Sequence, residues 1–156
     1  MLGEQVQPPM TPHPHLSVRT VIAADPLSVR AGLQALFESF PLNGLDADLR
    51  GTVEIVLAEA LNNIVEHAYA NFHGEIDLKI EQIGQHLHCT LRDQGLPMPN
   101  QTLPNGTLPA FDTGLDAPEG GFGWYLIRAL ATGLHYRRDG ATNLLQFTLD
   151  IDPAKH

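Results

Sequence analysis

The strongest constraint on the fold is a pair of alternating segments, residues 75–83 and 86–93, which are separated by only two residues. One side of each extended segment is apolar, formed by Ile76, Leu78 and Ile80 in the first and by Leu87, Cys89 and Leu91 in the second. Strict alternation is typical of a strand that buries one face. Because Gly84 and Gln85 make a tight turn, the pattern predicts two adjacent antiparallel strands.

The segment before this hairpin has the spacing of a long helix that starts near Asp46 or Asp48 and ends near Ala70. Its apolar arc consists of Val53, Val56, Leu57, Ala60, Leu61, Ile64, Val65 and Ala68. An arc of this width needs a partner surface, which the apolar side of the hairpin can supply. We therefore expect the helix to pack on the sheet.

The remaining segments complete an α+β arrangement. Residues 16–24 alternate as a strand, and a helix follows with Asp25 as its N-cap and Pro26 at its first position. A helix over residues 122–131 precedes a closing hairpin formed by "LHYRRD" and "NLLQFTLDI". This order predicts a two-layer α/β sandwich, in which helices cover one face of a mostly antiparallel sheet.

Two segments depart from regular periodicity. Residues 1–15 are rich in proline and are expected to form a flexible tail, so that one domain spans residues 16–152. Residues 94–120 also hold several prolines and glycines and show no period. A loop of this length inside a compact domain is usually functional or disordered.

Composition excludes several classes of protein. The chain of 156 residues has a formal net charge of -9 and no cluster of Lys and Arg for a phosphate backbone, so no nucleic-acid partner is expected. No apolar run approaches the ~20 residues that span a bilayer, and no signal peptide is evident. The single cysteine, Cys89, excludes an internal disulfide and is expected to be a buried small hydrophobe. These features predict a cytoplasmic protein with no membrane partner.

The long helix carries an unusual polar stripe. Glu59, Asn63 and His67 follow one another at intervals of four residues, on one side of a helix that is otherwise rich in Leu, Ile and Val. Taken alone, this stripe is most simply a solvated helix face. Whether it instead contributes to a binding site depends on the other motifs of the chain.

Two glycine-containing motifs bear on that choice. "LRDQGLPMP" places Asp93 and Gly95 at the end of a strand, which alone indicates an ordinary turn. "EGGFGWYLIRAL" places Gly120, Gly121 and Gly123 before a helix. Glycines there let backbone N–H groups approach an anion, and the helix N-terminus adds partial positive charge. Each motif by itself is weak evidence of a site.

The order of the three motifs resembles the N, G1 and G2 boxes of the GHKL ATPases, a superfamily that includes gyrase-type ATPase domains and the ATP-binding domains of histidine kinases. "EALNNIVEHAY" and "RDQGLPMP" are most similar to the anti-sigma-factor serine/threonine kinases. The resemblance covers residues 16–151. It implies the Bergerat type of ATPase fold, with ATP and Mg²⁺ as cofactors, and it favours a binding site over a solvated face.

The resemblance implies roles for the polar residues that their chemistry can support. Asn63 matches an asparagine that binds Mg²⁺ through its carbonyl oxygen. Glu59 matches the general base that would deprotonate a hydroxyl or a water near the γ-phosphate. Asp93 matches the acceptor of a hydrogen bond from the adenine 6-amino group. His67 is assigned to the orientation of the Asn63 region, with a structural histidine as the alternative.

The glycines and the long loop are also assigned by the resemblance. Gly95 is expected to let the base lie close to the backbone, and Gly121 and Gly123 are expected to cradle phosphates. Residues 100–120 are expected to form a mobile lid over the nucleotide. Trp124 departs from the leucine that the family usually carries there, and we expect its indole to pack beneath the lid.

The implied activity is phosphorylation of an anti-anti-sigma-type protein, with a sigma factor and a second copy of the chain as further candidate partners. Residues 94–123 contain no Lys or Arg, although phosphoryl transfer needs stabilising charge. Arg128 is one candidate for this charge, unless it only packs along its own helix. The missing charge favours an alternative, a nucleotide-gated protein-binding module with negligible catalysis. A histidine-kinase fragment is disfavoured because no phosphoacceptor hairpin precedes the domain.

Overall fold

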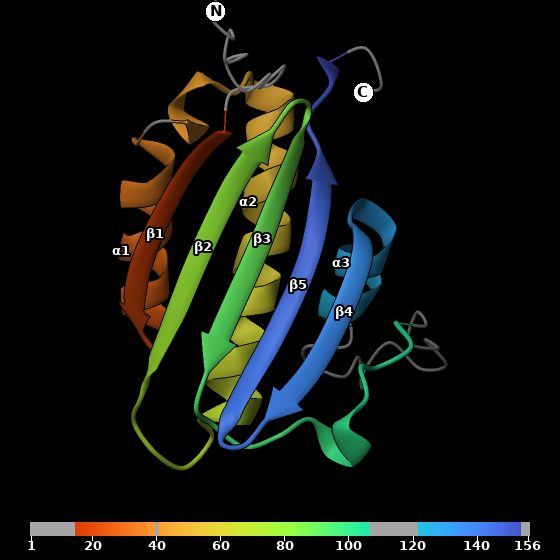
Figure 1. The fold of residues 1–156 in the computed structure, drawn as a ribbon. Coiled ribbons are helices and arrows are strands. Elements are labelled where there is room, and N and C mark those ends of the chain that lie inside the picture. The colour runs from red at the N-terminus through yellow and green to blue at the C-terminus, as the bar shows by residue number, and fades with distance from the viewer. Residues whose placement is uncertain (1–14, 40, 107–121, 154–156) are drawn as a thin grey trace, which may run out of the picture.

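A computed structural model of the chain describes residues 15–39, 41–106 and 122–153. Its strands and α-helices are β1 (His15–Ala23), α1 (Pro26–Phe37), α2 (Ala47–Asn63), β2 (Glu75–Ile83), β3 (His86–Asp93), α3 (Gly123–Leu130), β4 (Thr132–Asp139) and β5 (Thr142–Asp150). The five strands pair antiparallel in the order β1-β2-β3-β5-β4. The helices lie on one face of this sheet (Figure 1), which confirms the predicted two-layer α+β fold.

The first two helices begin at the residues that the sequence indicates. The Asp25 side chain accepts a hydrogen bond from the Ser28 backbone N–H at 2.8 Å, and Pro26 is the first residue of α1. Of the two candidate caps for α2, Asp46 is the one used, because its carboxylate accepts from the Leu49 N–H at 2.9 Å. Each cap satisfies a backbone donor that has no partner within the helix.

The core lies between α2 and the centre of the sheet. The predicted alternation of β2 and β3 is confirmed, with Ile80 opposite Cys89 and Leu78 opposite Leu91 in the register. All four of these side chains are buried, and burial raises the pKa of the Cys89 thiol. A buried, protonated thiol is a poor nucleophile, so Cys89 is part of the core, as expected.

The end of the long helix differs from the prediction. The α-helix stops at Asn63, and Ile64–Ala68 form one π-helical turn. This turn is closed by the Tyr69 N–H, which donates to the carbonyl five residues earlier at 3.1 Å. The Tyr69 side chain is held in place at the same time, because its hydroxyl donates to the Glu75 carbonyl and accepts from the Gln94 N–H, both at 2.8 Å. Through Tyr69, the end of this turn is therefore bound to the start of β2 and to the residue that follows β3.

Several expectations concern segments that the structure does not describe. Residues 1–14 of the proposed tail, Gly120, Gly121 and all of the proposed lid beyond residue 106 lie outside the described residues, whereas His15 is already the first residue of β1. The tail, the lid and the domain boundaries therefore stay predictions. Within the described ranges, the helices are all too short or too polar to cross a bilayer.

Candidate functional site

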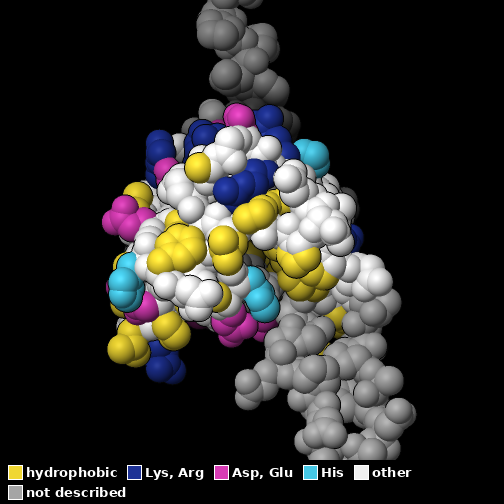
Figure 2. Space-filling model, turned by 90° about the horizontal axis from the view of Figure 1, so that it is seen from below, with side chains coloured by type: hydrophobic (Ala, Val, Ile, Leu, Met, Phe, Trp, Pro, Cys, Tyr) yellow, Lys and Arg dark blue, Asp and Glu magenta, His cyan; other side chains and the backbone are white. Residues whose placement is uncertain are grey.

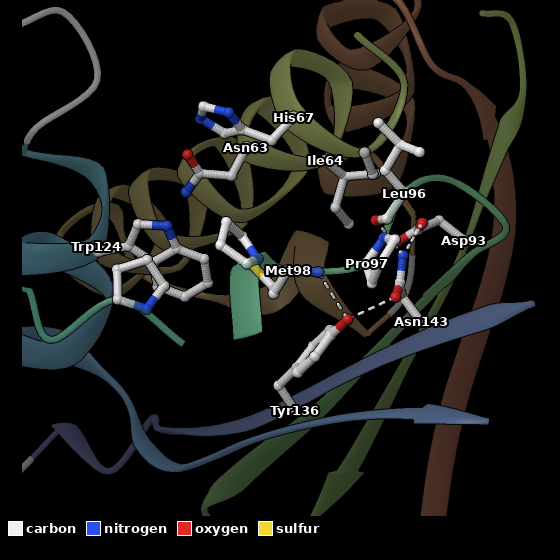
Figure 3. Close-up of a pocket in the computed structure, with 13 residues that line it drawn as sticks. Asn63, Ile64, His67, Asp93, Leu96, Pro97, Met98, Trp124, Tyr136 and Asn143 are labelled. Carbon is white, nitrogen blue, oxygen red and sulfur yellow. Dashed lines mark hydrogen bonds between the residues drawn. The ribbon is translucent and has the colours of Figure 1, made fainter. Parts of the chain in front are cut away.

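A pocket of about 380 Å³ opens at the end of the molecule where β3 finishes (Figure 2, Figure 3). It is lined by Asn63, Ile64, His67, Ala68, Asp93, Leu96, Pro97, Met98, Pro99, Pro104, Trp124, Tyr136 and Asn143. Figure 2 shows apolar side chains gathered on this end of the molecule, with basic and histidine side chains beside them. A mostly apolar cavity of this size with a few polar groups is typical of a small-molecule site.

The polar groups are divided between two ends of the pocket. Figure 3 shows Asn63 and Trp124 at one end and Asp93 and Asn143 at the other. The Asn63 side chain is buried, and its Nδ2 has no hydrogen-bond partner among the described residues. A buried polar atom without a partner costs about 1–3 kcal/mol, so Asn63 is a candidate for contact with a ligand.

Asp93 is held at the other end by hydrogen bonds to one of its oxygens. Its Oδ1 accepts from the Gly95 N–H at 2.9 Å and from Asn143 Nδ2 at 2.8 Å. Burial raises the pKa of Asp93, while these two hydrogen bonds and the charge of Arg138 oppose the rise. Within the described part of the chain both bonds end on Oδ1, so Oδ2 is the oxygen that can accept a hydrogen bond from a ligand.

Two glycines permit close approaches beside the pocket. A Cβ at Gly123 would lie 2.7 Å from Glu59 Oε2 and 3.4 Å from Asn63 Nδ2, so the start of α3 lies directly against the polar stripe of α2. A Cβ at Gly95 would lie only 2.4 Å from the Ala68 carbonyl oxygen. The G1-like and G2-like motifs thus both contact the end of the long helix.

The two glycines should differ in their tolerance of alanine. Gly95→Ala forces the new methyl group against the Ala68 carbonyl, which is already bound by the Leu96 N–H at 2.8 Å, so we expect a loss of about 1–3 kcal/mol of stability. Gly123→Ala meets the flexible end of Glu59 and should cost less. Thermal unfolding of both variants measures the difference, and equal losses would contradict the expected rigidity at Ala68.

The structure brings most of the predicted site residues together. Asn63, His67 and Asp93 line the pocket, whereas Glu59 lies outside it and faces Gly123. Trp124 is 7% exposed and forms part of the pocket wall.

Three further predicted positions, Gly95, Gly123 and Arg128, also lie outside the pocket wall. Gly95 lies behind it, with the Ala68 backbone as its close neighbour. Arg128 Nε donates to the Pro104 carbonyl at 2.9 Å, so this cation holds the chain after β3 and is not part of the pocket lining.

Two pocket residues were not anticipated from the sequence, Tyr136 on β4 and Asn143 on β5. The Tyr136 hydroxyl donates to Asn143 Oδ1 at 2.6 Å and accepts from the Met98 N–H at 3.0 Å. Asn143 does carry a detectable signal, because it occupies the same side of its strand as Leu145 and Phe147. An amide on an otherwise apolar strand face needs hydrogen-bond partners, and here it has them.

The donors fit a nucleotide better than a metal held by protein alone. The described residues include no group of three or more His, Cys, Asp and Glu side chains placed to hold a metal ion. The carbonyl oxygen of Asn63, which lies on the pocket wall, nevertheless suits Mg²⁺, because this ion commonly takes few protein ligands and completes its shell with water and phosphate oxygens. A metal at this end would therefore arrive with a phosphate-bearing ligand.

Known proteins share both the sequence pattern and the fold. Residues 22–149 match the family described as the histidine kinase-like ATPase domain. The serine/threonine-protein kinase BtrW of Bordetella bronchiseptica is 37% identical over 109 residues, which cover 69% of this chain and 75% of BtrW.

Two solved structures have a similar fold. The RsbU and RsbW domains of Rv1364c from Mycobacterium tuberculosis align with a TM-score of 0.60 at 16% identity, over 87% of this chain and 32% of that one. The blue-light activated histidine kinase EL346 of Erythrobacter litoralis aligns with a TM-score of 0.51 at 20% identity, over 71% of this chain and 33% of that one. The chain thus spans about a third of each solved chain.

Proposed function

Because the chain belongs to the histidine kinase-like ATPase family, which implies ATP binding, we propose that it is an ATP- and Mg²⁺-dependent serine/threonine protein kinase of the anti-sigma-factor type. Its substrate is an anti-anti-sigma-type protein in a partner-switching system, and a sigma factor is a further candidate partner. A relative that is itself named a serine/threonine-protein kinase supports the reaction class. The resemblance of the N-box and G1-box motifs supports the partner class.

The observation that most supports this proposal is the convergence of the three motifs. Asn63 and Asp93 lie at opposite ends of one pocket, and Gly123 lies against Glu59 and Asn63. We assign adenine to the Asp93 end, where Oδ2 can accept from the 6-amino group. The phosphates then extend toward Asn63 and the N-terminus of α3, where Gly123 allows a close approach of the backbone.

Asn63 and Glu59 are assigned to the phosphate end of the pocket. The Asn63 carbonyl oxygen holds Mg²⁺, and Glu59 acts as the base that takes a proton from the hydroxyl of the protein substrate. When bound, Mg²⁺ supplies positive charge to the phosphate oxygens. Glu59 lies one helical turn before Asn63 and outside the pocket wall, a position that suits a base facing an incoming substrate.

A second function has specific support. None of the described residues that line the pocket is Lys or Arg, and Arg128 is bound to Pro104. A site with little positive charge can bind Mg²⁺-ATP and still transfer phosphate slowly. The alternative is therefore a nucleotide-gated protein-binding module that sequesters its partner without appreciable turnover.

The single tryptophan offers a direct test of nucleotide binding. Trp124 is the only Trp of the chain and is nearly buried in the pocket wall. ATP with Mg²⁺ should therefore change the intrinsic fluorescence of the protein in a saturable way. GTP at equal concentration should change it less, and an absence of any saturable change, supported by calorimetry, would contradict ATP binding at this pocket.

Phosphoryl transfer separates the two functions. The chain is purified with its co-purifying protein and incubated with radiolabelled ATP and Mg²⁺. Label on a serine or threonine of that partner supports the kinase. Saturable ATP binding without transfer, together with nucleotide-dependent retention of the partner, supports the binding module instead.

A further inference from the structure

The Asn143 side chain, at the Asp93 end of the pocket, uses all of its hydrogen-bonding groups within the protein (Figure 3). Its Nδ2 donates to Asp93 Oδ1 and to the Leu96 carbonyl, both at 2.8 Å. Its Oδ1 accepts from the Tyr136 hydroxyl at 2.6 Å and from Arg138 Nη1 at 3.0 Å. Two donors and two acceptors exhaust the hydrogen-bonding capacity of one amide, so Asn143 has none left for a ligand.

The directions of these hydrogen bonds are fixed by their partners. Arg138 can only donate, so the amide oxygen of Asn143 faces it and the amide nitrogen faces Asp93. The Met98 N–H donates to the Tyr136 oxygen at 3.0 Å, so the hydroxyl proton points to Asn143. Oδ1 of Asp93 is consequently an acceptor, and a proton or a ligand donor has to go to Oδ2.

We propose that Asn143 is a positioning residue for base recognition. By occupying Oδ1 of Asp93, it reserves Oδ2 as the acceptor for the adenine 6-amino group. By binding Leu96 and Tyr136, it also fixes residues 96–98 in the pocket wall. This inference rests on the proposed binding of ATP. It assigns adenine selectivity to a residue on β5 whose own hydrogen bonds are all made within the protein.

The same arrangement has a consequence for pH. The charged and titratable groups that act on Asp93 are Arg138 from β4 and Tyr69 from the segment after the π-helical turn, while His67 lies at the Asn63 end of the pocket. The Asn143 hydrogen bond opposes the rise in the pKa of Asp93 that burial causes. Without that donor the pKa of Asp93 rises further, and Asp93 becomes protonated, and hence a donor, at a higher pH. The loss of ATP affinity on acidification should then begin at a higher pH.

The test compares ATP with ITP, which carries a 6-oxo group in place of the 6-amino group. Wild-type protein should bind ATP at least about tenfold more tightly, the usual effect of one hydrogen bond to a charged acceptor. Asn143→Asp keeps the shape of the side chain but replaces the donor with an acceptor. We expect the ATP affinity of this variant to fall about tenfold or more, and its ITP affinity to change less. The loss of ATP affinity on acidification should begin at a higher pH than in the wild type.

A second variant keeps the proposal testable if Asn143→Asp does not fold. Tyr136→Phe removes one hydroxyl and leaves the Asn143 amide, so the preference for ATP should fall about two- to tenfold. Asn43→Asp makes the same chemical change as the first variant at an exposed position far from the pocket and should leave both affinities unchanged.

The outcomes distinguish this inference from the proposed function. The role of Asn143 is overturned, and ATP binding is left intact, if the wild type prefers ATP and the folded variants keep the same preference and the same dependence of ATP affinity on pH. A purely structural role would weaken ATP and ITP equally, which also overturns it. A wild type that binds neither nucleotide, or binds both equally, overturns the assignment of Asp93 and this inference with it.

Discussion

Glu59→Ala is expected to slow phosphoryl transfer to the partner by about 10²–10⁴-fold, the usual loss when a general base is removed. ATP affinity should change little, because Glu59 lies outside the pocket wall and is assigned to the attacking hydroxyl. The measurement is transfer of radiolabelled phosphate to the partner, together with a calorimetric ATP titration of the same preparation.

Two further variants serve as a control and as a comparison for Glu59→Ala. Glu54→Ala removes an exposed carboxylate from the same helix and should transfer phosphate at the wild-type rate. Asn63→Ala should behave differently from Glu59→Ala, because it removes the proposed metal ligand and should weaken Mg²⁺-ATP binding as well as turnover. If Glu59→Ala transfers phosphate as fast as wild type, Glu59 is not the base, and if wild type transfers none, the binding module takes the place of the kinase.

Asp93→Asn is expected to weaken ATP binding about tenfold or more. The new amide can keep its oxygen toward Gly95 and Asn143, so the local hydrogen bonds survive. The group on the ligand side becomes an N–H donor, however, and it faces the adenine amino group, which is also a donor. Losing a hydrogen bond to a charged acceptor costs about 1.5–3 kcal/mol, which sets the expected loss of affinity.

The stability of this variant separates recognition from folding. Burial raises the pKa of Asp93, so ionised Asp93 is less favourable in the folded protein than in the unfolded chain at neutral pH. A neutral asparagine should therefore leave thermal stability unchanged or slightly higher. Asp48→Asn, at an exposed position at the start of α2, is the matched control for both measurements. Unchanged ATP affinity, or GTP bound as tightly as ATP by wild type, would count against Asp93 as the adenine acceptor.

Periodicity and local hydrogen bonding explain why the architecture was predictable. The β2–β3 hairpin follows from strict alternation, because a one-residue shift would turn Ile80 and Leu78 to solvent. The starts of α1 and α2 follow from Asp25 and Asp46, whose carboxylates bind backbone N–H groups three residues ahead. The alternation and the capping residues each act within a short stretch of chain, so they can be recognised in a single sequence.

The parts of the site that were missed depend on contacts between distant segments. Tyr136 on β4 and Asn143 on β5 join the loop after β3 to the last two strands of the chain, and β3 and β5 must pair before Asn143 can reach Asp93. The placement of Arg128 depends in the same way on the path of the chain to Pro104. Asn63 and Asp93 were found only because their motifs resemble those of a family, since nothing local indicates that they share a pocket.

The π-helical turn at Ile64–Ala68 makes the length of this segment as important as its composition. Such a turn amounts to one additional residue accommodated within an α-helix. Deleting one residue there would restore the regular helix but rotate everything beyond the deletion by about 100°. The Ala68 carbonyl would then face away from Leu96, and the surface against which Gly95 packs would be lost. Substitutions at the exposed Glu66 should therefore be tolerated, whereas deletion of a single residue from this turn should not be. In relatives of this chain, the number of residues between the N-box and the G1-box should accordingly matter more than the identity of the residues between them.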